Sequence, residues 1–569
     1  MTAASAFSAL RAIRLHDRVL APRQASHLAA TLPSSLKRCE ETGRLDAFRL
    51  QWREGMPNHP HVFWDSDVAK VVEGMAAAVE AGAGGEVAAE LERLVDLIVS
   101  AQQPDGYLNT FFTQCEPERR WADIFNAHEL YCAGHLMEAA VAHFRATGSR
   151  KFLDAMQRYS DRIAADFLSG PRERACPGHE EIELALVALY RATGEKRHLD
   201  LAKHFIDVRG GEPNYFVEKE HRWAGEMANR QAQAPVREQR QAVGHAVRAV
   251  YLYCGMVDVA VETGDAGLLE AAKALFADVA GRQMYVTGGI GATHEGEAFL
   301  GDWDLPNCHN YAESCAAIGL LFFAHRLLAA TGDGQYADVV ERVLYNNGLS
   351  GISLSGDAFF YANPMAMDDR FKDDGHIARE RRPWFDCSCC PTTYCRFLPR
   401  LGTYCYDARP DAVRVDIPAA GAIAAPGYEM AIESDYPYDG RATLRLTRGE
   451  AAVKVRVPGW CQGARVTVNG KAAPEPRLGY VDCGRLAAGA VVELDYPMRP
   501  GLVYANPRVL EDLGKAAVGC GPLVYCAESA DNPGVAVERA FIKQGAEFAR
   551  AAAQGLPEGT AAWRVAGAV

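Results

Sequence analysis

Four Thr-Gly pairs, each lying between two amphipathic segments, constrain the fold of this chain more than any other feature. They are Thr147-Gly148, Thr193-Gly194, Thr263-Gly264 and Thr331-Gly332. Glycine readily adopts the left-handed conformation that ends a helix, and a short link makes the two flanking helices antiparallel neighbours. Helical hairpins repeated at spacings of tens of residues predict either an open solenoid or a closed toroid of helices.

The helical pattern continues to about residue 405 and then changes. Segments such as DVAKVVEGMAAAVEA and EVAAELERLVDLIVSAQ carry apolar residues at helical spacing. Beyond residue 405, VKVRVPGW and VVELDYPM alternate apolar and polar residues, and Asn469-Gly470 predicts a hairpin turn. We therefore predict a helical domain over residues 1–405 and a β-sandwich over residues 406–535. Residues 536–569 have few strand signals, so we predict an incomplete or truncated second β region there.

Composition and charge limit the possible partners. Hydrophobic residues make up 49% of the 569 residues and charged residues 23%, enough to bury a large core. The net charge of -13 argues against nucleic acid, because phosphates select cationic surfaces. We find no run of the roughly 20 apolar residues that a membrane span needs. The start has no basic segment followed by an apolar run, so we predict no signal peptide and a cytoplasmic location.

Several polar residues lie near the starts of the repeated helices. His135 occurs in AGHLMEA, His179 in PGHEEIELA and His245 in VGHAVRAV, while the fourth unit, YAESCAAIG, carries Glu313 and Cys315. A single histidine at a helix start is usually a cap or a satisfied core residue. If the hairpins close into a ring, however, equivalent helix starts meet at one mouth, and convergent polar residues there predict a pocket.

The densest group of reactive side chains lies in WFDCSCCPTTYCRF, which holds Cys387, Cys389, Cys390 and Cys395. In a reducing compartment, clustered cysteines are metal ligands or catalysts more often than disulfides, and soft thiolates favour zinc. The segment lacks the paired knuckles of a zinc finger, so a remote group such as Glu313 and Cys315 must complete the site. A purely structural zinc and buried cysteines without a metal are the alternatives.

A glycine-rich loop upstream supplies carboxylates. The segment YVTGGIGATHEGEAFLGDWDL contains four of them, Glu295, Glu297, Asp302 and Asp304. Hydrolysis of a glycoside needs a carboxylic acid that protonates the leaving oxygen and a nucleophile on the other face of the sugar. A loop carboxylate beside a thiolate–zinc site could be that acid, although a solvated surface loop has the same composition.

Taken together, these motifs resemble those of the β-L-arabinofuranosidases of glycoside hydrolase family 127. The resemblance rests on the order of FWDSDVAKVVEG, DGYLNTFF, HELYCAGHLMEAA, PGHEEIELALVALY, AVGHAVRAVYLY, GEAF, DLPNCHNYAESCAAIG, FFYANPM and WFDCSCCP, which span most of the chain. It implies an (α/α)6 barrel followed by a C-terminal β-sandwich. Cys-Cys-Pro is followed here by Thr392-Thr393, where Pro-Asn is typical, which puts a precise substrate assignment in doubt.

Carried over motif by motif, the resemblance implies a role for each candidate site residue. Zn²⁺ would be held by Glu313, Cys315, Cys389 and Cys390. The nucleophile would be Cys389, and the general acid/base would be the glutamate of GEAF, Glu297. The sugar-contacting residues would be His135, His179, His245 and Tyr361.

The sequence therefore predicts a retaining glycoside hydrolase that releases L-arabinofuranose from β-L-arabinofuranosides. Its expected partner is a small carbohydrate, with a homodimer left open. Three alternatives remain at this point: a related glycosidase for another sugar, a sugar epimerase or isomerase on the same toroid, and a noncatalytic carbohydrate-binding protein with a structural zinc.

Overall fold

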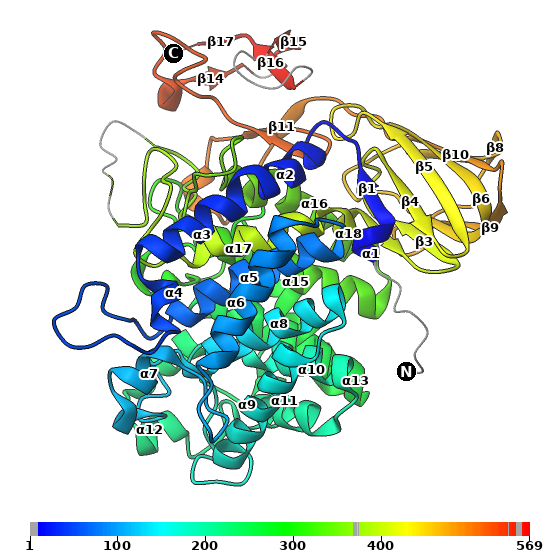
Figure 1. Ribbon diagram of the computed structural model, residues 1–569. Coiled ribbons are helices and arrows are strands. Elements are labelled where there is room, and N and C mark those ends of the chain that lie inside the picture. The colour runs from blue at the N-terminus through cyan, green and yellow to red at the C-terminus, as the bar shows by residue number, and fades with distance from the viewer. Residues whose placement is uncertain (1–8, 368–372, 374, 544, 553–559, 569) are drawn as a thin grey trace.

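The computed structural model describes residues 9–367, 373, 375–543, 545–552 and 560–568 of the chain. A large helical domain, coloured blue to green in Figure 1, is followed by a β domain, coloured yellow, that packs against one side of it. Helices come first and antiparallel sheets follow, as predicted.

Six inner helices form a closed ring. Each packs against the next one along the chain, and the last, α17, packs back against the first, α5. A closed toroid therefore forms rather than an open solenoid. The six helices are α5 (Trp64–Glu80), α8 (Glu129–Thr147), α10 (Ile182–Thr193), α13 (Ala246–Thr263), α15 (Ser314–Thr331) and α17 (Cys389–Phe397).

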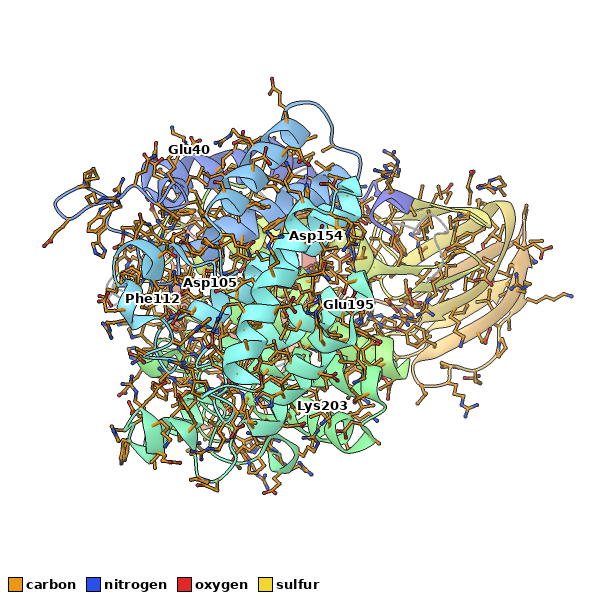
Figure 2. The ribbon with its side chains drawn as sticks, turned by 60° about the horizontal axis from the view of Figure 1, so that its bottom comes forward. Glu40, Asp105, Phe112, Asp154, Glu195 and Lys203 are labelled. Carbon is orange, nitrogen blue, oxygen red and sulfur yellow. The ribbon has the colours of Figure 1, made fainter. Side chains whose placement is uncertain are left out.

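A second set of helices packs around this ring. Each of them contacts one or two inner helices, and they are α3 (Leu32–Glu41), α6 (Glu86–Ser100), α9 (Lys151–Phe167), α11 (Lys196–Val208), α14 (Ala266–Asp278) and α16 (Gly334–Val343). Their outward faces carry charged side chains such as Asp154 and Lys203 (Figure 2), which pair with Arg150 and Asp207. The two concentric layers are the predicted (α/α)6 barrel.

The four Thr-Gly pairs end helices as the sequence predicted. Each glycine caps an inner helix with φ between 70° and 77°, in the left-handed region. Each threonine hydroxyl donates a hydrogen bond to the carbonyl four residues earlier in its helix. The chain then turns back into an outer helix, so that every inner helix runs in the same direction and the inner N-termini meet at one mouth.

One inner helix begins earlier than the sequence pattern suggested. The prediction placed His135 at a helix start, but α8 begins at Glu129 and His128 is its N-cap residue. Gly134 is an interior residue of α8 where α10 comes close: a Cβ there would overlap the Glu181 carboxylate and lie 2.9 Å from the Ile182 Cα. The glycine before His135 therefore marks a close helix contact instead of a helix boundary.

The β domain is built around one long strand. The first half of β6 (Arg441–Arg456) pairs with β5 (Tyr428–Ser434) and β10 (Val491–Asp495), and its second half pairs with β3 (Ala412–Val415) and β9 (Tyr480–Ala487). β6 thereby joins the two layers of the sandwich. The remaining strands are β2 (Tyr406–Ala408), β4 (Gly421–Ala425), β7 (Arg465–Val468) and β8 (Lys471–Ala472).

A strand from the start of the chain also belongs to this sheet. β1 (Ile13–Leu15) pairs antiparallel with β4. The sandwich is anchored to the barrel through α16, where the buried Glu341 carboxylate accepts hydrogen bonds from Arg456 (2.6 Å) and from the Trp460 indole (2.9 Å). The β domain thus braces the outside of the barrel at α16.

The last part of the chain holds only short strands. A three-stranded sheet contains β11 (Gly501–Val503), β12 (Ala517–Cys520) and β13 (Leu523–Tyr525). Beyond it, the described residues form two strand pairs, β14 (Phe541–Ile542) with β17 (Gly567–Ala568) and β15 (Phe548–Ala552) with β16 (Ala561–Val565). The boundaries predicted at residues 405 and 535 stay predictions.

Among the described helices, α15 alone is long and apolar enough to span a bilayer by composition. Its most apolar stretch is 72% buried, as expected for an inner helix enclosed by its neighbours.

The contact between α8 and α10 gives a stability test. We expect Gly134→Ala to destabilise the protein by about 1–3 kcal/mol, because the added methyl group has no room beside Glu181 and Ile182. Gly84→Ala is the matched control, since a Cβ at Gly84 meets nothing within 4 Å. Urea unfolding measures both variants, and equal stability of the two would contradict the assigned packing.

Candidate active site

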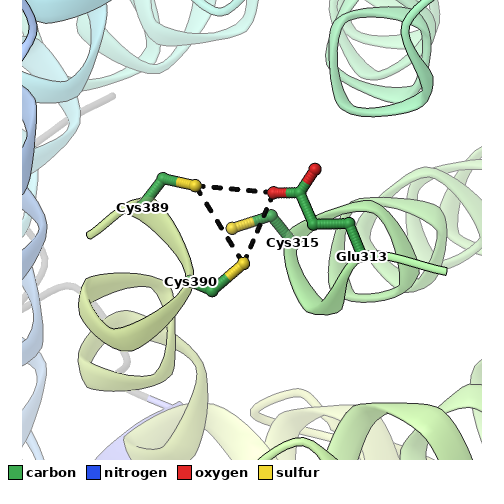
Figure 3. A group of neighbouring side chains, drawn as sticks. All are labelled: Glu313, Cys315, Cys389 and Cys390. Atoms are coloured by element: carbon green, nitrogen blue, oxygen red, sulfur yellow. Dashed lines mark hydrogen bonds between the residues drawn. The ribbon is translucent and has the colours of Figure 1, made fainter. Parts of the chain in front are cut away.

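The inner helix N-termini bring two cysteine segments together at the barrel mouth. Cys389 and Cys390 open α17, and Glu313 and Cys315 lie at the start of the neighbouring helix α15. One carboxylate oxygen of Glu313 lies 3.4 Å from the Sγ atoms of both Cys389 and Cys390, which are 4.0 Å from each other (Figure 3). With the Cys315 sulfur, the four ligand atoms lie within 4.8 Å of one another.

Glu297 faces the same group from the glycine-rich loop. Its Oε2 accepts a hydrogen bond from His245 Nε2 at 2.6 Å, and its Oε1 accepts one from the Tyr311 hydroxyl at 2.9 Å. Burial raises the pKa of Glu297, but His245 and the two hydrogen bonds outweigh it and lower the pKa to about 2. Oxygens of Glu297 and Glu313 and a His245 nitrogen also lie within 4.8 Å of one another, so the acid is adjacent to the thiol cluster.

A row of histidines leads away from Glu297 along the mouth. The His245 ring lies 5.5 Å from that of His179, and the His179 ring lies 5.5 Å from that of His128. His128 and His245 are the N-cap residues of α8 and α13, and His179 lies two residues before Glu181, the N-cap residue of α10. The row is therefore a consequence of ring closure, which aligns three successive helix starts.

Tyr361 and His376 connect Cys389 to Tyr311 at the mouth. The Tyr361 hydroxyl lies 2.8 Å from Cys389 Sγ. The His376 ring stacks on the Tyr361 ring at 3.8 Å and 11°, and His376 Nδ1 lies 2.8 Å from the Tyr311 hydroxyl. Because the single Tyr311 proton goes to Glu297, His376 Nδ1–H must donate to Tyr311, which links the two tyrosines to the acid.

Models of one protein family match this chain along most of its length. The model of the "Beta-L-arabinofuranosidase, GH127 catalytic domain" matches residues 12–403, and the middle-domain and C-terminal-domain models of the same family match residues 413–498 and 500–561. The chain belongs to glycoside hydrolase family 127.

Relatives of this family resemble the chain in sequence and structure. A non-reducing end β-L-arabinofuranosidase of Bifidobacterium longum subsp. longum is 39% identical over 516 residues, which cover 84% of this chain and 77% of that protein. The crystal structure of a GH127 β-L-arabinofuranosidase from Geobacillus stearothermophilus T6 is 39% identical with a TM-score of 0.89, covering 95% of this chain and 90% of that one. The GH127 β-arabinofuranosidase BT3674 is 35% identical with a TM-score of 0.88, covering 96% and 89%.

Membership of family 127 makes the protein a glycoside hydrolase and removes the support for an epimerase or a noncatalytic binding protein. The structure brings nearly all of the site residues predicted from the sequence together at the barrel mouth. Those that converge at the barrel mouth are Glu297, Glu313, Cys315, Cys389, Cys390, His179, His245 and Tyr361.

His135 does not join that group. Its side chain is fully buried two turns into α8, and its Nδ1 accepts a hydrogen bond from Arg396 at 3.1 Å. Arg396 also pairs with Glu73 and Glu138 from α5 and α8, so these residues form an ion-pair network inside the barrel. Burial, together with the charges of Lys70 and Arg396, lowers the pKa of His135 well below its usual value. The structure places His128, not His135, beside His179.

Three residues at the mouth, His128, Tyr311 and His376, were not predicted from the sequence. His128 could have been found, because HELY precedes a long apolar run and the helix start lies there rather than at the glycine. Tyr311 precedes the Glu-Ser-Cys segment, but nothing in the sequence marks it as a partner of Glu297. His376 lies in an irregular segment without periodicity, so no sequence signal pointed to it.

The four-residue cluster fits a zinc ion. Ligands about 2.0–2.3 Å from a tetrahedral zinc are roughly 3.3–3.8 Å apart, close to the spacings between Glu313, Cys389 and Cys390. Burial and the nearby charges of Cys389 and Glu297 raise the pKa of Glu313 well above its usual range. Cys315, Cys389 and Cys390 form no disulfide, so the three sulfurs are available as metal ligands. A divalent cation would offset the repulsion among these four donors.

Metal analysis tests this fit. We expect about one zinc ion per purified chain, with most of it lost in Cys390→Ser because a serine hydroxyl is a poor replacement for a thiolate ligand. Cys526→Ser is the matched control, since Cys526 is exposed and distant in sequence from the cluster. Zinc bound equally by both variants, measured by inductively coupled plasma mass spectrometry, would contradict the assigned ligands.

Proposed function

We propose that this family 127 enzyme is a retaining β-L-arabinofuranosidase in which Cys389 is the nucleophile and Glu297 is the general acid/base. The main support for this proposal is that Cys389 and Glu297 lie close together. Glu313 contacts the Cys389 sulfur and also lies beside the Glu297 carboxylate. Nucleophile and acid thus face one pocket at the barrel mouth. The names of the relatives, β-L-arabinofuranosidases, supply the sugar.

Zinc held by Glu313, Cys315, Cys389 and Cys390 would lower the thiol pKa values, so that thiolates dominate at neutral pH. The start of α17 favours the same state. Cys389 is its first residue, where the helix dipole stabilises negative charge. The Tyr361 hydroxyl, 2.8 Å from the Cys389 sulfur, can donate to the thiolate and fix its direction.

The first step breaks the glycosidic bond. Cys389 Sγ attacks the anomeric carbon and forms a C–S bond, while the C–O bond to the aglycone breaks and its oxygen takes a proton from Glu297. Glu297 accepts the Nε2–H hydrogen bond of His245 at 2.6 Å as a carboxylate, so it takes up the proton for this step from solvent beforehand. Burial and the charge of Arg248 lower the pKa of His245, which favours the neutral imidazole.

The second step releases the sugar. Glu297 takes a proton from water, the water oxygen bonds to the anomeric carbon, and the C–S bond breaks to restore the Cys389 thiolate. Two displacements at one carbon retain its configuration. His179, His245 and His128 lie where they can hydrogen-bond the hydroxyl groups of the sugar, and Tyr311 and His376 hold Glu297 in position through the hydrogen-bond chain.

Two variants test the roles of these residues. We expect Cys389→Ser to lower kcat/KM on p-nitrophenyl β-L-arabinofuranoside by at least about 10³-fold, because it removes the nucleophile. Glu297→Gln should lower kcat/KM on an arabinofuranosyl disaccharide by about 10²–10⁴-fold, and less on the nitrophenyl substrate, whose leaving group needs little protonation. Glu295→Gln is the matched control, because Glu295 is exposed two residues away. Full activity in either site variant would overturn its role.

The stereochemical course gives a second test. We expect the first sugar released to be the β anomer, because a double displacement retains configuration. Proton NMR recorded before mutarotation distinguishes the anomers, and α-L-arabinofuranose as the first product would contradict a covalent intermediate. A panel of nitrophenyl glycosides tests the alternative of another sugar. A cytoplasmic location and a homodimer are further proposals that fractionation and sedimentation would test.

A further inference from the structure

A cavity lies beside the proposed catalytic residues. Its volume is about 600 Å³, within the range of small-molecule sites. We call it the aromatic cavity, because rings form much of its wall: among the lining residues are His61, Phe63, Trp64, His376, Trp384 and Cys387. They come from the start of α5, the loop before it, and the segment that leads into α17.

The aromatic cavity meets the catalytic group at one side through His376 and Cys387. His376 stacks on Tyr361, whose hydroxyl lies 2.8 Å from Cys389 Sγ and 3.6 Å from Cys387 Sγ. Tyr361 thus lies between these two lining residues and the proposed nucleophile.

A second connection runs along the histidine row. The Phe63 ring lies edge-on to the His128 ring at 5.9 Å, and His128 lies 5.5 Å from His179. Phe63 is also the N-cap residue of α5, next around the ring from α8. The aromatic cavity thus adjoins both the Tyr361–His376 pair and the histidine row. A group attached to a sugar bound at the mouth would extend toward this cavity.

The chemistry of the cavity favours a neutral, hydroxyl-rich ligand. The only lining cation in the described wall, apart from the histidines, is Arg44, which is buried and paired with Asp67 at 2.8 Å. Trp64 and Trp384 hold its guanidinium, with ring centroids at 5.0 and 5.3 Å. Its charge is therefore already balanced and does not select an anion. Glu41 and Asp386 add carboxylates that can accept hydrogen bonds from hydroxyl groups.

The geometry points to the aromatic cavity as the aglycone subsite, where the sugar unit that leaves in the first step binds. Ring faces stack on the apolar faces of sugars, and the rim carboxylates fix their hydroxyl groups. The inference rests on the proposed function and adds to it the residues that would contact the leaving group.

His61 provides the test, because its exposed side chain lies 4.1 Å from the Phe63 ring and outside the catalytic group. We expect His61→Ala to lower kcat/KM for a β-L-arabinofuranosyl disaccharide about three- to tenfold, the effect of one lost ring contact. Hydrolysis of methyl β-L-arabinofuranoside should be unchanged, because a methyl group does not reach the cavity. His61→Phe, which keeps a ring, should restore the disaccharide rate.

The control is His16→Ala, which removes an exposed histidine on the β-domain side of the molecule and should alter neither substrate. If wild-type enzyme hydrolyses both substrates but His61→Ala lowers both equally, or lowers neither, the aglycone assignment is wrong while the proposed function stands. If the wild type hydrolyses neither arabinofuranoside, the proposed function itself fails, and the assignment fails with it.

Discussion

The packing of α17 against α5 is the constraint on which the site depends. This contact closes the ring of inner helices and brings the start of α17 beside the start of α15. Without it, Cys389 and Cys390 would have no fixed relation to Glu313 and Cys315, which come more than 70 residues earlier in the chain. Six helix N-termini at one mouth also give a positive electrostatic environment, which favours carboxylate and thiolate groups.

Charge is balanced separately at two depths of the barrel. At the mouth, one carboxylate and three thiol groups lie close together and could hold a metal ion. Farther in, Arg396 joins Glu73, Glu138 and His135, so buried charges there are paired within the protein. Lys70 connects the two levels: its buried ammonium donates to the Tyr131 hydroxyl at 2.8 Å, and the Tyr131 ring packs against His179 at 4.2 Å. The ion pairs deeper in the barrel thus hold the helices together below the mouth, where the proposed metal site and sugar site lie.

Much of this arrangement is predictable from the sequence, because it follows from local signals. Thr147-Gly148 and the three equivalent pairs predict the repeated helical hairpins. The adjacent Cys389 and Cys390 predict a metal site. The predicted helix start at His135 is wrong for a physical reason: Gly134 resembles a helix boundary, but it provides room for a close contact with α10. His376 could not be predicted, because its role depends on stacking against Tyr361, which only the folded chain establishes.

We propose that Glu313, Cys315, Cys389 and Cys390 hold one zinc ion at the barrel mouth. X-ray absorption spectroscopy at the zinc edge of the purified enzyme tests this ligand set most directly. We expect three sulfur neighbours at about 2.3 Å and one oxygen neighbour at about 2.0–2.2 Å. A zinc surrounded only by nitrogen and oxygen, or a fully active enzyme without zinc, would contradict it.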